Sequence, residues 1–271
     1  MEGTHQNAAI PPKNLPQSLG ASLFLEDNRH MQKPTQEPVR QDVWQMFDRI
    51  AWRYDFLNRI LSMGIDRGWR EQMANMLPPR SSLKVLDLAT GTADVPLTFI
   101  KSNHDITHIT GMDLSEKMLD IGREKIKAQH FEDRITLSTG DAMQIPAESD
   151  AYDAATISFG IRNVPDVLTT LKEMHRVLNA GGHALILEFS TPEIPGFKQG
   201  YLFYLRHILP QIGAALSGDS YAYRYLNQTI ETFPYGQDFC DLMLEAGFSQ
   251  AEAVPLTGGI ATIYRGVKPY S

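Results

Sequence analysis

Short apolar runs alternate with amphipathic segments from residue 83 to residue 190, and this alternation constrains the fold more than any other feature of the chain. Strand patterns occur at LKVLDLA (83–89), HITGMDL (108–114), ITLSTGDA (135–142), YDAATISFG (152–160) and HALILEFS (183–190). Helical patterns separate them, which implies βαβ units with right-handed crossovers. The sequence therefore predicts an α/β fold built on a doubly wound, mostly parallel sheet.

Several boundaries of these elements can be predicted from single residues. Ser115 is placed to cap the helix SEKMLDIGREKIKAQ, and Gly181 and Gly182 are expected to end the helix that precedes the fifth strand. Two later runs, AEAVPL and GIATIYRGVK, are joined through TGG. They predict a hairpin at the edge of the sheet.

The composition changes near residue 40. Residues 1–40 are rich in Pro, Gln and Asn and show no sustained apolar period, so we expect a loose polar leader. Residues 41–271 are expected to form a single domain, since 42% of the chain is hydrophobic and can supply one sizeable core. This domain would include a helical segment before the sheet and a helical lid insert at about residues 195–232.

The charge balance argues against a nucleic-acid partner. The formal net charge is -7, whereas proteins that bind a phosphate backbone normally present a basic face. Cys240 is the single cysteine, so an internal disulfide is excluded, and its helical surroundings favour a buried thiol over a nucleophile. With no signal-peptide pattern and no membrane-spanning stretch, we expect a cytoplasmic protein. Peripheral contact with the inner face of a membrane and homo-oligomer formation stay open.

The loop after the first strand, LDLATGTADVP (86–96), indicates a small-molecule site. Ligands of such sheets bind beyond the carboxyl ends of the strands. Asp87 and Gly91 are expected to let the backbone approach a ligand, and Thr92 adds a hydroxyl. Because Ala89 and Ala93 stand where a dinucleotide fingerprint has glycines, a nucleoside without phosphates fits better than a pyrophosphate.

Two further carboxylates follow the next strands. Asp113 ends the second strand, about 20 residues past the loop, where a carboxylate can accept both hydroxyls of a ribose. Asp141 and Ala142 follow the third strand, where a carboxylate and a backbone N–H could meet an adenine ring. The alternatives are a charge beside a helix for Asp113 and a capping aspartate in a turn for Asp141.

Together these segments resemble the class I S-adenosylmethionine-dependent methyltransferases. A narrower resemblance rests on YDFLNRILSMGIDRGW (54–69), ISFGIRNVPD (157–166), RVLNAGGHALILEFS (176–190) and FPYGQDFCDLMLEAGF (233–248). These stretches are similar to signatures of the ubiquinone/menaquinone biosynthesis C-methyltransferases, over about residues 43 to 267. The chain departs from that family at Asp66, where a histidine is usual, and at Asn179 and Ala180, where Lys-Pro is common.

The resemblance implies methylation of a ring carbon of a polyprenylated quinol, with S-adenosylmethionine as methyl donor. It also implies a cofactor contact at Ser158, beside Thr92, Asp113, Asp141 and Ala142. Whether the acceptor is a naphthoquinol (demethylmenaquinol) or the corresponding benzoquinol of ubiquinone biosynthesis stays open.

Arg162 is the first candidate for stabilising the phenolate oxygen of the acceptor, because its guanidinium stays cationic. The alternative for Arg162 is a salt bridge to a nearby acid. Asn163 could orient the same oxygen or cap the following helix.

Aromatic residues supply the other candidates. Tyr54, with Phe47, could close over the sulfonium of the cofactor, although both also have the spacing of a core-facing stripe. In the lid insert, Tyr221 and Tyr225 would share a helical face and are predicted at the acceptor site. The histidines show no metal-ligand spacing, so no metal is expected. A nicotinamide-dependent oxidoreductase and a noncatalytic binding protein stay open as alternative classes.

Overall fold

The computed structural model describes residues 64–209 and 232–270 continuously, together with residues 43–45, 48, 51, 59, 62, 211, 225, 229 and 230. Contacts divide the chain into Met1–Glu37 and Pro38–Ser271. All described residues belong to the second of these units. The predicted division into a leader and one domain with a lid insert stays a prediction.

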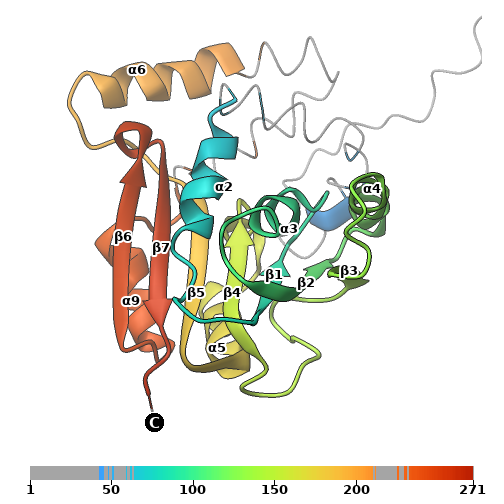
Figure 1. The fold of residues 1–271 in the computed structure, drawn as a ribbon. Helices are drawn as coiled ribbons and strands as arrows, with labels where there is room; N and C mark the ends of the chain where they lie inside the picture. The colour runs from blue at the N-terminus through green and yellow to red at the C-terminus, as the bar shows by residue number, and fades with distance from the viewer. Residues whose placement is uncertain are drawn as a thin grey trace, which may run out of the picture. The chain divides into compact units, whose positions relative to one another are not determined.

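Within the described residues, seven strands form one sheet in the order β3-β2-β1-β4-β5-β7-β6. Their bounds are β1 Leu83–Leu88, β2 Ile106–Asp113, β3 Ile135–Thr139, β4 Tyr152–Ser158, β5 Leu178–Phe189, β6 Gln250–Leu256 and β7 Ala261–Val267. Strands β1 to β5 pair in parallel, whereas β7 is antiparallel to both β5 and β6 (Figure 1). The predicted doubly wound, mostly parallel sheet with a C-terminal hairpin is confirmed.

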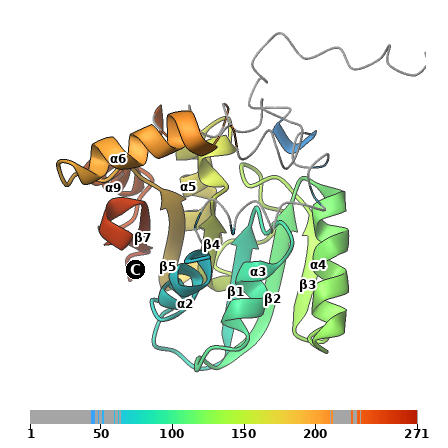
Figure 2. The ribbon, with the colours of Figure 1, turned by 90° about the horizontal axis from the view of Figure 1, so that it is seen from above.

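Helices cover both faces of this sheet. The named α-helices of the described residues are α2 Asp66–Ala74, α3 Asp94–Phe99, α4 Glu116–Ala128, α5 Val167–Val177, α6 Phe197–Phe203 and α9 Gln237–Glu245, of which α6 lies beyond the ends of β6 and β7 (Figure 1). Side chains of α2, α3 and α4 belong to one apolar cluster, and side chains of α5 and α9 belong to a second. The view from above shows α2 and α3 on the face opposite to α5 and α9 (Figure 2). Cys240 of α9 is a buried free thiol, as expected.

Local capping signals account for two helix starts. The Oγ of Ser115 accepts a hydrogen bond from the backbone N–H of Met118 (3.3 Å), which confirms the predicted cap of α4. Helix α5 begins after Asp166, whose carboxylate accepts from the N–H of Thr169 (3.0 Å). The cap of α5 is therefore Asp166 and not Asn163.

The prediction for Gly181 and Gly182 was wrong. Both glycines lie inside β5, which begins at Leu178, directly after α5. The N–H of Gly181 donates to the carbonyl of Lys268 (2.9 Å), and the N–H of Lys268 donates to the carbonyl of Gly182 (3.0 Å). Pairing with the C-terminal segment thus extends the strand past a position where glycines alone would favour a turn.

Candidate active site

A cavity of about 330 Å³ lies at the carboxyl ends of the first four strands. Its lining includes five of the predicted cofactor residues, namely Gly91, Asp113, Asp141, Ala142 and Ser158. Its walls also contain apolar side chains that the sequence did not single out, among them Trp44, Leu114, Met118, Met143 and Val164. The strand order brings these residues together, since they lie at or just after the ends of four parallel strands, β1 to β4, and these strands end at the same edge of the sheet.

Asp113 is the last residue of β2 and is tied to the loop after β1. Its Oδ2 accepts from the backbone N–H of Gly91 (2.9 Å), and its Oδ1 accepts from the N–H of Ser115 (2.8 Å). Burial raises the pKa of the Asp113 carboxyl, although these N–H donors act in the opposite direction. A carboxylate has about four lone-pair positions, so those that the backbone N–H groups do not occupy can accept the hydroxyls of a ligand.

The loop after β1 adopts left-handed backbone conformations without the usual glycines. The φ angles are 48° at Ala89, 55° at Gly91 and 64° at Ala93. Ala89 and Ala93 are the two positions at which a dinucleotide fingerprint would have glycine. Alanine there is strained by about 1 kcal/mol per residue, so the loop keeps its turn by tertiary contacts.

Asp87 and Thr92 lie outside the cavity lining. The Asp87 side chain is buried below the loop, where its Oδ2 accepts from the Thr90 hydroxyl (2.6 Å) and its Oδ1 accepts from the Thr156 hydroxyl (2.5 Å). Burial raises the pKa of Asp87 to about 7 against these two hydrogen bonds. The Oγ1 of Thr92 accepts from the Nζ of Lys125 (2.9 Å).

Asp141 and Ala142 both line the cavity, and Asp141 also forms a turn. The Oδ1 of Asp141 accepts from the N–H of Met143 (2.8 Å). The turn that was considered as an alternative is therefore present, and it places Asp141 in the lining rather than excluding it.

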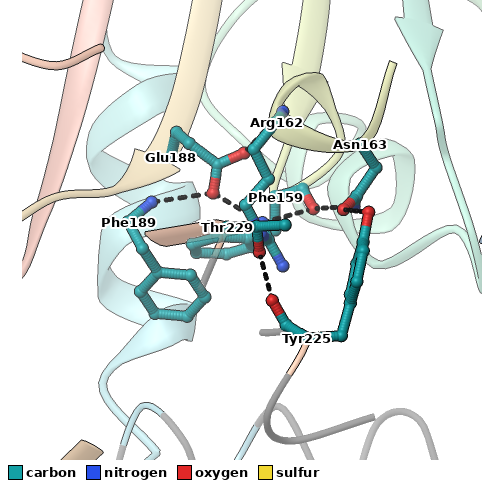
Figure 3. Close-up of polar contacts among 7 residues, drawn as sticks. All are labelled: Phe159, Arg162, Asn163, Glu188, Phe189, Tyr225 and Thr229. Atoms are coloured by element: carbon teal, nitrogen blue, oxygen red, sulfur yellow. Dashed lines mark hydrogen bonds and ion pairs between the residues drawn. The ribbon is translucent and has the colours of Figure 1, made fainter. Parts of the chain in front are cut away.

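Arg162 follows β4 in the short helix η2 (Ile161–Asn163) and forms a buried ion pair, as its alternative interpretation stated. Its Nη1 donates to Oε1 of Glu188 (2.6 Å) and to the carbonyl of Phe159 (2.7 Å) (Figure 3). Arg162 is absent from the cavity lining, whereas its neighbours Phe159, Gly160 and Asn163 are part of it.

Asn163, which lines the cavity, contacts a residue of the predicted lid insert. The Tyr225 hydroxyl donates to Oδ1 of Asn163 (3.2 Å), so these side chains meet at the end of β4 (Figure 3). Tyr54, Phe47 and Tyr221 lie outside the described residues. Their assigned roles stay predictions.

Asp66, the departure from the family pattern, is the first residue of α2 and is 2% exposed. Its Oδ2 pairs with Nη1 of Arg70 (2.8 Å), and its Oδ1 accepts from the Ser62 hydroxyl (2.8 Å). Asp66 does not line the cavity. Its contacts support the packing of α2.

Glu188 is the functional candidate that sequence reasoning missed. It is fully buried in β5, where the neighbouring residues are apolar. The sequence signal was the position of Glu188 inside an otherwise apolar strand pattern. A charged side chain is rarely buried without a partner, so this position indicates a buried ion pair.

The described part of the chain contains no group of three or more His, Cys, Asp or Glu side chains that could hold a metal ion. None of its helices combines the length and apolar character that crossing a lipid bilayer requires.

The sequence is similar to proteins of one known family. The model of the ubiE/COQ5 methyltransferase family matches residues 34–268. A protein of Geobacter sp. (strain M21) named ubiquinone/menaquinone biosynthesis C-methyltransferase UbiE is 47% identical over 223 residues, covering 82% of this chain and 94% of that protein. A demethylmenaquinone methyltransferase of Porphyromonas gingivalis is 39% identical over 234 residues, covering 86% and 96%.

Solved structures agree on the fold. A SAM-dependent methyltransferase from Aquifex aeolicus matches with a TM-score of 0.52 at 14% identity, covering 73% of this chain and 88% of that one. The [4+2]-cyclase SpnF matches with a TM-score of 0.59 at 17% identity, covering 86% and 98%. Because that cyclase has the same fold, the fold alone does not define the reaction.

The sheet and cavity, taken with these matches, define an S-adenosylmethionine-dependent methyltransferase. The family model covers most of the chain and is more specific. The chain belongs to the ubiE/COQ5 methyltransferase family.

Proposed function

We propose that this enzyme methylates a ring carbon of a polyprenylated quinol, converting demethylmenaquinol to menaquinol with S-adenosylmethionine as donor. The observation that carries the proposal is that one cavity brings Asp113 together with the turn from Ser158 to Asn163. The names of the relatives, which specify quinone C-methylation, support it. The corresponding benzoquinol is the alternative acceptor, since the same groups would handle either ring.

The residues of the cavity fit S-adenosylmethionine. Asp113 would accept the ribose hydroxyls through its remaining lone pairs. The Asp141 carboxylate and the Ala142 N–H would bind the adenine edge, with apolar contact from Leu114 and Met118. Gly91 lets the backbone approach the ligand, and Ser158 would lie by its methionine portion.

When bound, S-adenosylmethionine supplies an electrophilic methyl group on a sulfonium, so the protein must mainly align an electron-rich ring carbon with it. The Oδ1 of Asn163 accepts from Tyr225, and its Nδ2 makes a long hydrogen bond of 3.5 Å to the Phe159 carbonyl, so one amide N–H would be left to donate to the acceptor's phenol oxygen. Donors aimed at a developing phenolate lower the barrier to transfer. Arg162 would add positive charge behind Asn163, moderated by the carboxylate of Glu188.

Apolar side chains on the lid support contact with a membrane that holds the prenyl chain. Phe197 (41%), Phe203 (58%) and Ile208 (40%) are exposed on α6 and the helical turn that follows it. Lys198, which is partly exposed, and Arg206, which is exposed, lie in the same segment. Such a segment can rest on an anionic bilayer surface without crossing it, and sedimentation with anionic vesicles would test this.

The test of the proposed function is a methyl-transfer assay with two reduced acceptors, short-chain demethylmenaquinol and the matching benzoquinol. We expect the kcat/KM for demethylmenaquinol to be higher than the kcat/KM for the benzoquinol. Calorimetric titrations with S-adenosylmethionine and NAD are run beside it. Cofactor binding without transfer to either quinol would favour a binding protein, and tight NAD binding would favour an oxidoreductase.

A further inference from the structure

Glu188 is a buried carboxylate that contacts Arg162, which follows β4, through both of its oxygens. It is the penultimate residue of β5 and is 0% exposed. Its Oε1 accepts from Nη1 of Arg162 (2.6 Å) and from the N–H of Phe189 (2.8 Å). Its Oε2 faces the backbone N–H of Arg162 (3.4 Å). Apolar residues of similar volume are often at least as stabilising as a buried ion pair, so stability alone does not explain this carboxylate.

The backbone next to this ion pair is strained. Phe159 has a φ of 55°, a conformation that a bulky residue rarely adopts. Such residues persist where the surroundings over-determine them, and they cluster at functional sites. Here the N–H of Phe159 donates to the carbonyl of Leu187 (2.8 Å), and its carbonyl accepts from Arg162 (2.7 Å). Both hydrogen bonds depend on neighbouring residues of β5. Leu187 accepts the first directly, and Glu188 acts on the second by pairing with Arg162.

The strained turn carries the residues that face the cavity. Ser158, Phe159, Gly160 and Asn163 all line it, and Asn163 is also the partner of the Tyr225 hydroxyl. The ion pair lies directly beneath the turn, and Arg162 is 5.5 Å from the centre of the Phe189 ring (Figure 3). A change at Glu188 would therefore reach the cavity through Arg162 and the Phe159 carbonyl.

One nitrogen of the Arg162 guanidinium is not used by the contacts described above. Its Nε is buried and has no hydrogen-bond partner among the residues that the structure describes. A buried N–H without a partner is costly and uncommon in native structures. Glu188 thus fixes a cation that retains a donor beside the turn.

We infer that Glu188 is a positioning residue for methyl transfer. It holds the Arg162 guanidinium against the carbonyl of Phe159 and so fixes the turn that presents Asn163 to the acceptor. Glu188 itself touches neither ligand, since it does not line the cavity. This inference rests on the proposed function, because its main readout is methyl transfer to a quinol.

The experiment compares Glu188→Gln, Arg162→Met and the double variant Glu188→Leu/Arg162→Met with the parent enzyme. Glu188→Gln keeps the shape but loses the charge and one acceptor. We expect its kcat to fall at least about tenfold, with the Kd for S-adenosylmethionine changed by less than about threefold. The matched control is Glu193→Gln, an exposed glutamate five positions further on, which should keep the parent kcat.

The double variant separates positioning from folding. It has no unpaired buried charge, so its Tm should exceed that of either single variant. Its kcat should equal that of Arg162→Met within about threefold, because Glu188 acts through Arg162. A double-variant kcat far below that of Arg162→Met, or a kcat for Glu188→Gln within about twofold of the parent, would overturn the inference. The inference would also be overturned if the double variant regained the parent kcat along with a higher Tm.

A spectroscopic readout keeps the test independent of the acceptor. The centre of the Trp69 ring lies 6.2 Å from the ring centre of Phe159 and 6.3 Å from that of Phe189. The Nε1 of Trp69 donates to the Thr257 hydroxyl (2.9 Å). Glu188→Gln should shift the Trp69 indole N–H resonance in an NMR spectrum without any quinol. If the parent enzyme methylates neither quinol, the proposed function fails, whereas an unshifted resonance contradicts the inference itself.

If Glu188→Gln does not fold, Glu188→Asp replaces it with the same expected results. Aspartate keeps the negative charge but moves it away from Arg162, because its side chain is shorter.

Discussion

A side-chain carbon added at Gly160 would lie 2.5 Å from the Cβ of Ala89, so these two residues share one space beside the cavity. Gly160→Ala should therefore lower the free energy of unfolding by about 1–3 kcal/mol through overpacking. It should also weaken S-adenosylmethionine binding, because both residues line the cavity. Chemical denaturation and calorimetry measure the two effects.

Ala89→Gly should rescue Gly160→Ala, since it removes the clashing carbon and relieves the positive φ of residue 89. A double variant as unstable as Gly160→Ala would contradict this explanation. Gly200→Ala is the control, because nothing lies within 4 Å of its added carbon in α6. It should stabilise the protein by about 0.5–1 kcal/mol.

Asp113→Ala should weaken the binding of S-adenosylmethionine by about 3 kcal/mol, on the order of a hundredfold in Kd. The variant loses the acceptor for the ribose hydroxyls and the hydrogen bond that fixes Gly91. Arg162→Ala should leave this Kd nearly unchanged and slow transfer by about a hundredfold. Equal Kd values for the parent and Asp113→Ala would remove the assigned role of Asp113.

Asp87 should make the protein less stable as the pH rises. Its pKa is raised by burial from 3.8 to about 7, so the folded state binds the proton more tightly than the unfolded chain does. The stabilisation is full below the unfolded pKa and is lost as the pH rises through 7. Relative to the parent, Asp87→Asn should gain about 2–4 kcal/mol between about pH 4 and pH 8. Urea unfolding across this range checks it, and parallel pH profiles would rule it out.

Asp66→Asn should cost about 2 kcal/mol of stability, because Arg70 loses its close buried partner and keeps only Asp94 at 3.5 Å. The kcat should stay within about twofold of the parent, since Asp66 does not line the cavity. Asp120→Asn breaks an exposed pair with Arg123 and should cost less than about 0.5 kcal/mol. A large loss of kcat in Asp66→Asn would show that position 66 handles a proton after all.

Tyr225→Phe should lower kcat by about threefold to tenfold with little change in the Kd for S-adenosylmethionine. It removes the hydroxyl that donates to Asn163 and leaves the amide held only by its long hydrogen bond to the Phe159 carbonyl (3.5 Å). Tyr270→Phe is the control, because Tyr270 is 77% exposed. A change in Kd without a change in kcat would place Tyr225 on the cofactor side of the cavity.

The fold could be predicted from the sequence because its signals are local. Apolar periodicity located the strands, and Ser115 marked the start of α4 by a hydrogen bond within one turn. The residues that end parallel strands share an edge, so Asp113, Asp141 and Ser158 were predictable members of one cavity. The same reasoning was wrong for Gly181 and Gly182, where pairing with Lys268 outweighed the glycines.

The partners of the buried charges were decided by the tertiary structure. Arg162 and Glu188 are 26 residues apart, and nothing between them in the sequence predicts their ion pair. Asp87 was expected at the ligand, yet it lies beneath the loop because the adjacent β4 places the Thr156 hydroxyl against it. Local sequence determines which segments form helices and strands. Which polar groups lose water, and which groups they then meet, depends on how those elements pack across the sheet, because the cost of burial exists only once the core is closed.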